Sequence, residues 1–368
     1  MKLHSIKPSI LSIPFVQAFK HASAERSATQ ALWVEARDAG GLAGYGEGCP
    51  REYVSGEDLA TAQTFVAVHG EDWLMQIHDM DSLRAWVAGH AAEIDANPAA
   101  WTAVELALLD LLGREQGCAI EKLLGLKVLS GRFRYTAVLG DASPQAFEAQ
   151  VARYRQVGFT SFKIKLSGDR VRDLAKVRAL SAAGITSDAV RADANNLWDD
   201  AGVATDYLRA LDYHFMALEE PLRAGDRTGM DQLAQALDTR IILDESLLRT
   251  EQLAEFAGQP QRWIVNLRIS KMGGLLRSLA MVEEIRDFRL GLIIGAHVGE
   301  TSVLTRAALT VAHSGHDILL AQEGAFGTYL LTRDVVDSPL MFGAGGMLDV
   351  DASRFAAKSG LGLEMRTT

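Results

Sequence analysis

The sequence predicts an α/β protein: a modified (β/α)8 TIM barrel of the (β/α)7β type with a smaller α+β capping domain. From about residue 134, short apolar runs that read as strands alternate with stretches of helical periodicity, which is the pattern of a parallel barrel. Three acidic residues that end such runs lie 26 and 25 residues apart, at 193, 219 and 244, and this is the length of one strand–helix unit. A chain of 368 residues suits a barrel with an accessory domain. We expect the capping domain at 1–125, completed by 335–368, and the barrel at 126–334.

The first third of the chain predicts a small antiparallel sheet followed by helices. Residues 2–16 alternate loosely and contain two prolines, as an edge strand does, while 29–37 and 42–47 flank a Gly-Gly turn. The Gly44-x-Gly46 spacing is not a dinucleotide-binding fingerprint, because a loop and not a helix follows it. Helical periodicity is found at 56–77, 81–94 and 99–115, and the last stretch is apolar almost all round, so we expect it to be buried.

The barrel region predicts eight strands whose last residues meet at one mouth. Helical stretches such as 144–157 and 274–287 lie between them, and Gly158, Gly184 and Gly291 fall where helices should end or strands begin. We expect the barrel to lack a full last helix. The strands are expected near 134–139, 161–165, 188–193, 214–219, 240–244, 264–268, 291–296 and 318–322.

Composition excludes several classes of protein. The net charge is −10 without a basic stripe, so nucleic acid is not an expected partner. The two cysteines, Cys49 and Cys118, lack CxxC spacing, which favours a reducing cytoplasm. The residues around Ala22-Ser23-Ala24 resemble a signal-cleavage site, but prolines and polar residues break the apolar stretch before them, so we expect no signal peptide. No apolar run approaches the ~20 residues of a membrane span.

Three strand-end acids are the candidate metal ligands. Asp193, Glu219 and Asp244 would converge at the barrel mouth, and three carboxylates suit a hard cation, Mg²⁺ or alternatively Mn²⁺. One such acid alone would more often cap a helix, whereas three in register favour a metal. Their polar neighbours are candidates for orienting the ligands. These neighbours are Asn195, Glu220 and Glu245.

Two lysines next to the acids are the candidate bases. Lys163 and Lys165 lie two apart on one strand and therefore face the same side, the barrel interior. We expect burial and mutual repulsion to lower their pKa values and to make one of them a base near neutral pH. The alternative is an edge-strand pair that reaches solvent. Further polar residues follow later strands: Arg268 as an anion partner, His297 as a second base, and Glu323 as a substrate contact.

Together these motifs resemble the enolase superfamily, specifically its muconate-lactonizing subgroup, over nearly the whole chain. The motifs are Lys163-x-Lys165, Asp193-x-Asn195, Glu219-x-Pro221, Asp244-Glu245-Ser246 and Gly273-Gly274. The resemblance implies that Mg²⁺ holds a substrate carboxylate while Lys165 removes the α-proton through an enediolate intermediate, with Lys163 beside it.

The resemblance also implies a capping region that selects the substrate. Loops around 17–26 and 49–57 would close over the barrel mouth. On these loops, Arg26, Arg51 and Tyr53 are the candidate contacts to a distal polar group of the substrate. The alternative is that they are solvated loop residues.

Three departures from the family pattern leave the reaction open. Arg268 stands where the subgroup has a second lysine. His297 stands where the mandelate racemase subgroup has its histidine, but the supporting aspartate is absent. The Asp-x-Asp clamp of dipeptide epimerases is absent around 322–324.

The expected function is therefore a Mg²⁺-dependent isomerase or lyase acting on a small carboxylate, with muconate-type cycloisomerisation as the leading reaction. The alternatives are racemisation or epimerisation of an amino acid derivative or dipeptide, and syn-dehydration. A non-catalytic, metal-dependent carboxylate-binding protein is the alternative from another class. The resemblance also implies a homo-oligomer.

Overall fold

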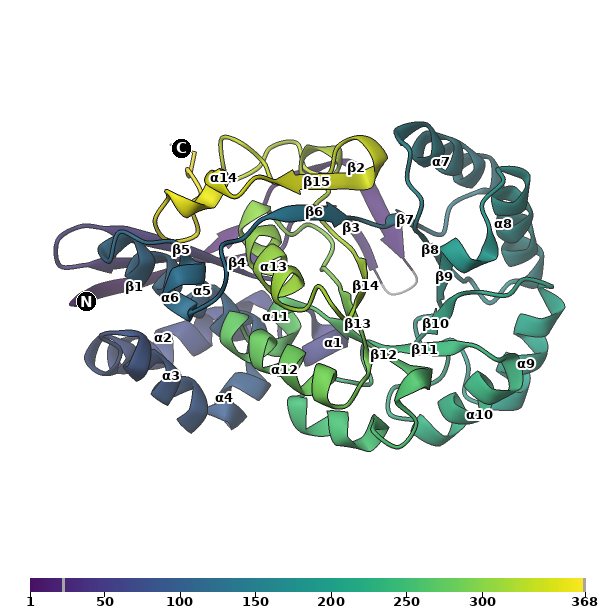
Figure 1. Cartoon of the computed structure of the whole chain (residues 1–368), viewed down its shortest axis with the longest axis horizontal. Helices are drawn as coiled ribbons and strands as arrows, with labels where there is room; N and C mark the ends of the chain where they lie inside the picture. Colours follow the sequence, from purple (N-terminus) through teal and green to yellow (C-terminus); the bar gives the residue numbers. More distant parts are fainter. Residues whose placement is uncertain (22–23, 367–368) are drawn as a thin grey trace.

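The computed structural model describes residues 1–21 and 24–366, and the side chains of residues 17–26 lie outside this description. The N-terminal strands and helices lie beside a curled sheet with helices around it (Figure 1). The N-terminal sheet is antiparallel with the order β1-β4-β5, so the predicted edge strand is at an edge. A separate hairpin pairs two further strands. The strands are β1 (Leu3–Leu11), β2 (Pro14–His21), β3 (Ala24–Ala28), β4 (Ala31–Asp38) and β5 (Ala43–Gly48).

Helix α5 (Pro98–Glu115) packs directly against β5, and glycines make this approach feasible. A Cβ atom on Gly46 would lie 1.9 Å from the carbonyl oxygen of Ala103, and Gly44 and Gly48 face the helix in the same way. The Gly-x-Gly spacing therefore serves packing. Residues 98–113 of α5 are all buried, as its composition predicted. The neighbouring helices are α1 (Glu52–Ser55), α2 (Leu59–Gln76), α3 (Met80–Gly89), α4 (Ala91–Ala96) and α6 (Ile120–Leu124).

The predicted barrel is confirmed as an eight-stranded parallel sheet in sequential order from β7 to β14. An isolated parallel bridge between Tyr135 and Gln322 brings the first and last strands together, so the curled sheet closes on itself. The strands are β7 (Ala137–Leu139), β8 (Phe162–Lys165), β9 (Val190–Asp193), β10 (Ala217–Glu219), β11 (Arg240–Leu243), β12 (Trp263–Leu267), β13 (Gly291–Ile294) and β14 (Leu319–Gln322).

Helices follow the strands with two exceptions. After β11 the chain forms 3-10 turns at Thr250–Phe256 and Pro260–Arg262, and after β14 it forms only the short turn Gly327–Tyr329, in agreement with the expected (β/α)7β type. The barrel helices are α7 (Pro144–Val157), α8 (Arg170–Ala182), α9 (Ala201–Ala210), α10 (Arg227–Leu237), α11 (Ile269–Met272), α12 (Leu275–Asp287) and α13 (Ser302–Ser314).

The C-terminal tail returns toward the N-terminal helices, as its yellow trace shows (Figure 1). Strand β15 (Met347–Val350) pairs with β6 (Gly131–Arg134), and the short helix α14 (Ser353–Ala356) follows. The backbone N–H of Ile120 donates to the carbonyl of Gly360 at 3.0 Å. The tail therefore packs on the first part of the chain, while the exact domain boundaries stay a prediction.

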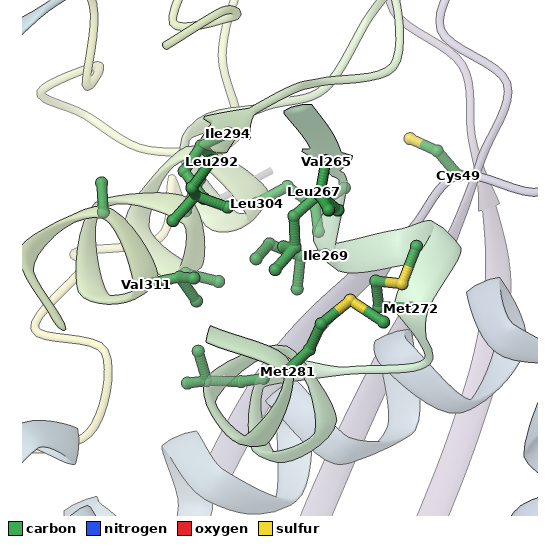
Figure 2. Packing of buried hydrophobic residues seen from close by; sticks show 14 of the residues in the cluster. Cys49, Val265, Leu267, Ile269, Met272, Met281, Leu292, Ile294, Leu304 and Val311 are labelled. Carbon is green, nitrogen blue, oxygen red and sulfur yellow. The ribbon is translucent and has the colours of Figure 1, made fainter. Parts of the chain in front are cut away.

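One continuous hydrophobic cluster joins the two parts of the molecule. Val265 and Leu267 of β12 and Leu292 and Ile294 of β13 point toward α11, α12 and α13 (Figure 2). The backbone N–H of Cys49 in the N-terminal part donates to Ser270 Oγ of α11 at 2.7 Å. This shared core fixes the capping region relative to the barrel strands. Among the described residues, no helix has the length and apolar character that crossing a membrane requires.

Candidate active site

The three predicted metal ligands meet at one end of the barrel. Asp193 is the last residue of β9 and Glu219 the last of β10, and the two are paired in register. Asp244 directly follows β11. All three side chains are buried, with at most 1% of their surface exposed. Neighbouring parallel strands deliver these carboxylates side by side, as the residue spacing predicted.

Side-chain cations contact each of these carboxylates. Lys165 Nζ donates to Asp193 Oδ2 at 2.5 Å and to Asn195 Oδ1 at 2.8 Å. Lys163 Nζ donates to Glu219 Oε2 at 3.1 Å and to Glu323 Oε2 at 2.7 Å. The guanidinium of Arg268 bonds to Oδ2 of Asp244. Both predicted lysines therefore face the barrel interior together with the acids.

Three buried polar residues of the site were not predicted. Lys271 lies on α11, and its Nζ reaches back to Asp244 Oδ1 at 3.0 Å and to the carbonyl oxygen of Asn266 at 2.8 Å. Asn266 itself donates to Glu219 Oε1, and Arg191 lies 2.9 Å from Glu323 Oε1. The sequence could have indicated two of them, because residues two apart on a strand face the same side. Arg191 and Asn266 each stand two residues before a predicted site residue.

The electrostatics of Lys163 differ from the expectation. Burial lowers its pKa, but Glu219, Glu323 and Asp193 outweigh this effect and raise the pKa above its usual value. The expectation that this lysine's pKa is lowered was therefore wrong. The surrounding carboxylates stabilise the charged ammonium group more than burial and the neighbouring cations destabilise it. Burial and the charge of Asp193 raise the pKa of Glu219 to about 7, despite Lys163. Burial opposes ionisation of Asp193 too, but Lys165 and Lys163 lower its pKa to about 2.

The residues next to the acids hold the strand ends in place. The backbone N–H of Asn195 donates to Asp193 Oδ1 at 3.0 Å. Glu220 accepts hydrogen bonds from the backbone N–H groups of Asp244 and Ser246 at 2.6 and 2.8 Å. Both Asn195 and Glu220 have positive φ angles, 47° and 41°, so the backbone turns sharply where the ligands end.

Three carboxylates are suitable ligands for a divalent cation, although Asp193, Glu219 and Asp244 form ion pairs with lysine and arginine side chains. Among the described residues, no three His, Cys, Asp or Glu side chains stand in a metal-binding arrangement as they are. However, Glu245, next to Asp244, has a buried Oε2 without a hydrogen-bond partner among the described residues. Burial and Asp244 raise its pKa to about 9. An unsatisfied carboxyl group beside three buried carboxylates is a place where an added cation would be stabilised.

A cavity of about 520 Å³ opens above the acids and is lined by both lysines, Glu245, Arg268 and Glu323. His297, which follows β13, lies on its wall, with Nδ1 3.5 Å from Glu300 Oε1. Burial raises the pKa of Glu300 to about 8.

The predicted substrate contacts from the capping loops are placed differently from one another. Tyr53 lines the cavity. Arg51 is buried and donates to the backbone carbonyls of Gln30, Pro50 and Val298. Its guanidinium therefore joins loops behind the cavity wall and is not part of the lining, although Val298 is. The side chain of Arg26 lies outside the described part of the chain.

Fold and site together define a barrel protein with an acidic triad, a lysine pair and a cavity above them. The family described as Enolase C-terminal domain-like matches residues 146–368. The chain belongs to this family, and the predicted membership of the enolase superfamily is confirmed.

Known relatives span nearly the whole chain. A hydrophobic dipeptide epimerase of Enterococcus faecalis is 24% identical over 336 residues, covering 89% of this chain and 92% of that protein. Muconate cycloisomerase 1 of Rhodococcus opacus is 25% identical over 356 residues, covering 94% and 92%. The relatives are enzymes with different reactions.

A solved structure has the same fold. The Enterococcus faecalis dipeptide epimerase complexed with Mg and the dipeptide L-Leu-L-Tyr superposes with a TM-score of 0.83 at 23% identity, covering 99% of this chain and all of that one. At this identity the likeness concerns the fold.

Proposed function

We propose that this protein is an isomerase that removes the proton α to a carboxylate of a small acid, with Lys165 as the base. The observation that carries the proposal is the position of Lys165. Its Nζ lies at the cavity wall and contacts Asp193, one of the three buried acids. A group that moves an α-proton must stand at the point where charge on the substrate can be stabilised.

Asp193, Glu219 and Asp244 would hold Mg²⁺, or Mn²⁺ in its place. When bound, such a cation polarises a carboxylate and offsets the negative charge that develops beside it. Lys163 remains charged, because the carboxylates around it raise its pKa, so it supplies a fixed positive charge near the substrate. Arg268 is permanently charged and therefore orients an anion without carrying the proton.

Return of the proton to the opposite face, as in a racemase or epimerase, is the outcome that we favour. A second acid is required there, and His297 lines the same cavity from β13, three strands from β8 around the closed sheet. Histidine is the side chain whose ordinary pKa lies near neutrality. Several relatives are epimerases or racemases, including the N-succinyl-L-Arg/Lys racemase of Bacillus cereus, which supports this outcome.

Muconate-type cycloisomerisation is the second candidate. It needs one base, and Arg268 replaces the second lysine with a group that does not titrate. Muconate cycloisomerases among the relatives support it. A cytoplasmic location and a homo-oligomer stay predictions.

The test is deuterium exchange with Mg²⁺ in D₂O on hydrophobic L-dipeptides, N-succinyl-L-arginine and muconolactone, followed by NMR. We expect deuterium at the α-carbon of at least one compound and a loss of about 10²- to 10⁴-fold in Lys165→Ala, the usual contribution of a positioned base. His297→Asn should keep exchange but lose inversion if two bases act. Exchange that survives in Lys165→Ala would rule out the base assignment. Compounds that bind tightly without any exchange would instead favour a carboxylate-binding protein.

A further inference from the structure

The acidic triad is already neutralised by side chains of the chain itself. Asp193 pairs with Lys165 at 2.5 Å and Glu219 with Lys163 at 3.1 Å. Asp244 pairs with Lys271 at 3.0 Å. A divalent cation entering the triad would therefore add charge to a cluster in which every carboxylate has a partner.

Asp244 differs from the other two acids, because two cationic side chains hydrogen-bond to it. Asp193 and Glu219 each hydrogen-bond to one cation, and their second cation lies 3.7 and 3.9 Å away. Lys271 holds its Oδ1 and its backbone carbonyl, while Arg268 bonds to its Oδ2. The same Nη2 atom of Arg268 lies 3.9 Å from Glu219 Oε1, so this part of the guanidinium approaches both acids. If Arg268 withdrew, Asp244 would keep one partner, so Arg268 is the cation that can leave at least cost.

The surroundings of Arg268 also suit a side chain with a second position. Lys271 is buried, and its Nζ donates to three acceptors on Asp244 and Asn266. Arg268, in contrast, lines the cavity. The Nε of Arg268 is buried and has no hydrogen-bond partner among the described residues. A partly satisfied, buried guanidinium gains hydrogen bonds if it turns toward an anion in the cavity.

We propose that Arg268 and a divalent cation compete for the Asp244 carboxylate, so that metal binding releases the guanidinium into the cavity. The inference rests on the proposed metal ligands. Mg²⁺ binds carboxylate oxygens at about 2.0–2.1 Å. A bound ion would therefore place a second positive charge beside the Arg268 guanidinium at Oδ2 of Asp244, and the two cations repel each other in this buried site. The released guanidinium then serves as the anion-binding group, which couples the binding of metal and carboxylate substrate.

The first test is the affinity for Mg²⁺ alone, measured by isothermal titration calorimetry on wild-type protein and on Arg268→Met. Removal of the competitor should tighten Mg²⁺ binding, and couplings of this kind amount to about 5- to 150-fold. Arg153→Met is the matched control. Arg153 lines the same cavity and is exposed, with its guanidinium over the Tyr329 ring, so its loss should leave the affinity nearly unchanged. Equal or weaker Mg²⁺ binding in Arg268→Met overturns the proposal.

A second measurement needs no variant and covers the case in which Arg268→Met does not fold. A crystal structure of the wild-type protein with Mg²⁺ should show the guanidinium of Arg268 away from Asp244 and inside the cavity. Mg²⁺ on Asp244 with the Arg268 contact intact contradicts the competition. The result is independent of turnover, so protein that binds Mg²⁺ as expected but fails to exchange α-protons would contradict the proposed function alone.

Discussion

The role of Arg51 in the structure differs from the role that its place in the sequence predicts. The sequence places it on a capping loop, where an arginine suits an anionic substrate. In the structure Arg51 is 2% exposed, and its guanidinium donates to three backbone carbonyls. One of these carbonyls belongs to Val298, directly after His297, so Arg51 supports the cavity wall from behind.

Arg51→Met should therefore reduce stability. Three backbone carbonyl groups, one in a buried and two in partly buried hydrogen bonds, would lose a charged donor. We expect the free energy of unfolding to fall by about 2–4 kcal/mol, since a hydrogen bond to a charged group contributes roughly 1.5–3 kcal/mol and partial relaxation follows. Urea unfolding measures this. Tyr53→Ala is the matched control, because Tyr53 is 42% exposed and lines the cavity. It should change stability by less than about 0.5 kcal/mol. Equal effects of the two substitutions would refute the supporting role of Arg51.

At the scale of elements, the contact of β5 with α5 positions the capping loops. Gly44, Gly46 and Gly48 all face the helix, which is buried along nearly its whole length. The segment that carries Arg51 and Tyr53 begins where β5 ends, and Tyr53 lies on its short helix α1. The distance between this strand and this helix therefore sets where the loop reaches the barrel.

Gly46→Ala should separate the strand and the helix. Its Cβ would lie 1.9 Å from Ala103 O, and both partners are backbone, so we expect a loss of about 3 kcal/mol or more, as in severe overpacking. Gly70→Ala provides the opposite case. Gly70 lies within α2 with nothing within 4 Å of an added Cβ, so alanine should stabilise by about 0.5–1 kcal/mol. Thermal unfolding compares them, and a neutral Gly46→Ala would show that the glycines are not required.

At the scale of the whole molecule, buried acids of the N-terminal part cap two barrel helices. Glu105 on α5 accepts from the backbone N–H groups of Leu275 and Leu276 at the start of α12. Glu47 on β5 accepts from Thr301 and Leu304 at the start of α13. These helices follow the segments that carry Arg268 and His297. Burial, opposed by these hydrogen bonds, raises the pKa of both Glu47 and Glu105 to about 7.

The raised pKa values make stability depend on pH in a defined direction. The folded-state pKa of such a carboxyl group lies above its unfolded-state pKa of about 4.3. Its contribution to stability is complete below about pH 4.3 and is lost as the pH rises through the folded-state pKa. We expect stability to fall between about pH 5 and 7, by up to about 1.4 kcal/mol per pH unit for each group. Glu105→Gln should flatten this slope in urea unfolding. Glu148→Gln, on the exposed face of α7, is the control. Identical slopes in wild type and Glu105→Gln would contradict the role of Glu105.

The sequence by itself determined the barrel, the acidic triad and the lysine pair. Strand periodicity and the constant length of a strand–helix unit are local properties, and they bring Asp193, Glu219 and Asp244 to one mouth without knowledge of any side-chain contact. Membership of the superfamily follows from the same short motifs.

Only the tertiary structure decided which partners these residues have. Lys271 reaches Asp244 from another element, the carboxylates around Lys163 raise its pKa, and Arg51 lies behind the cavity. Long side chains can extend in many directions from one backbone position, and their charge depends on neighbours far away in the sequence. The pairing of Arg268 with Asp244 is of this kind, because packing of the complete barrel, and no local pattern, brings these two groups together.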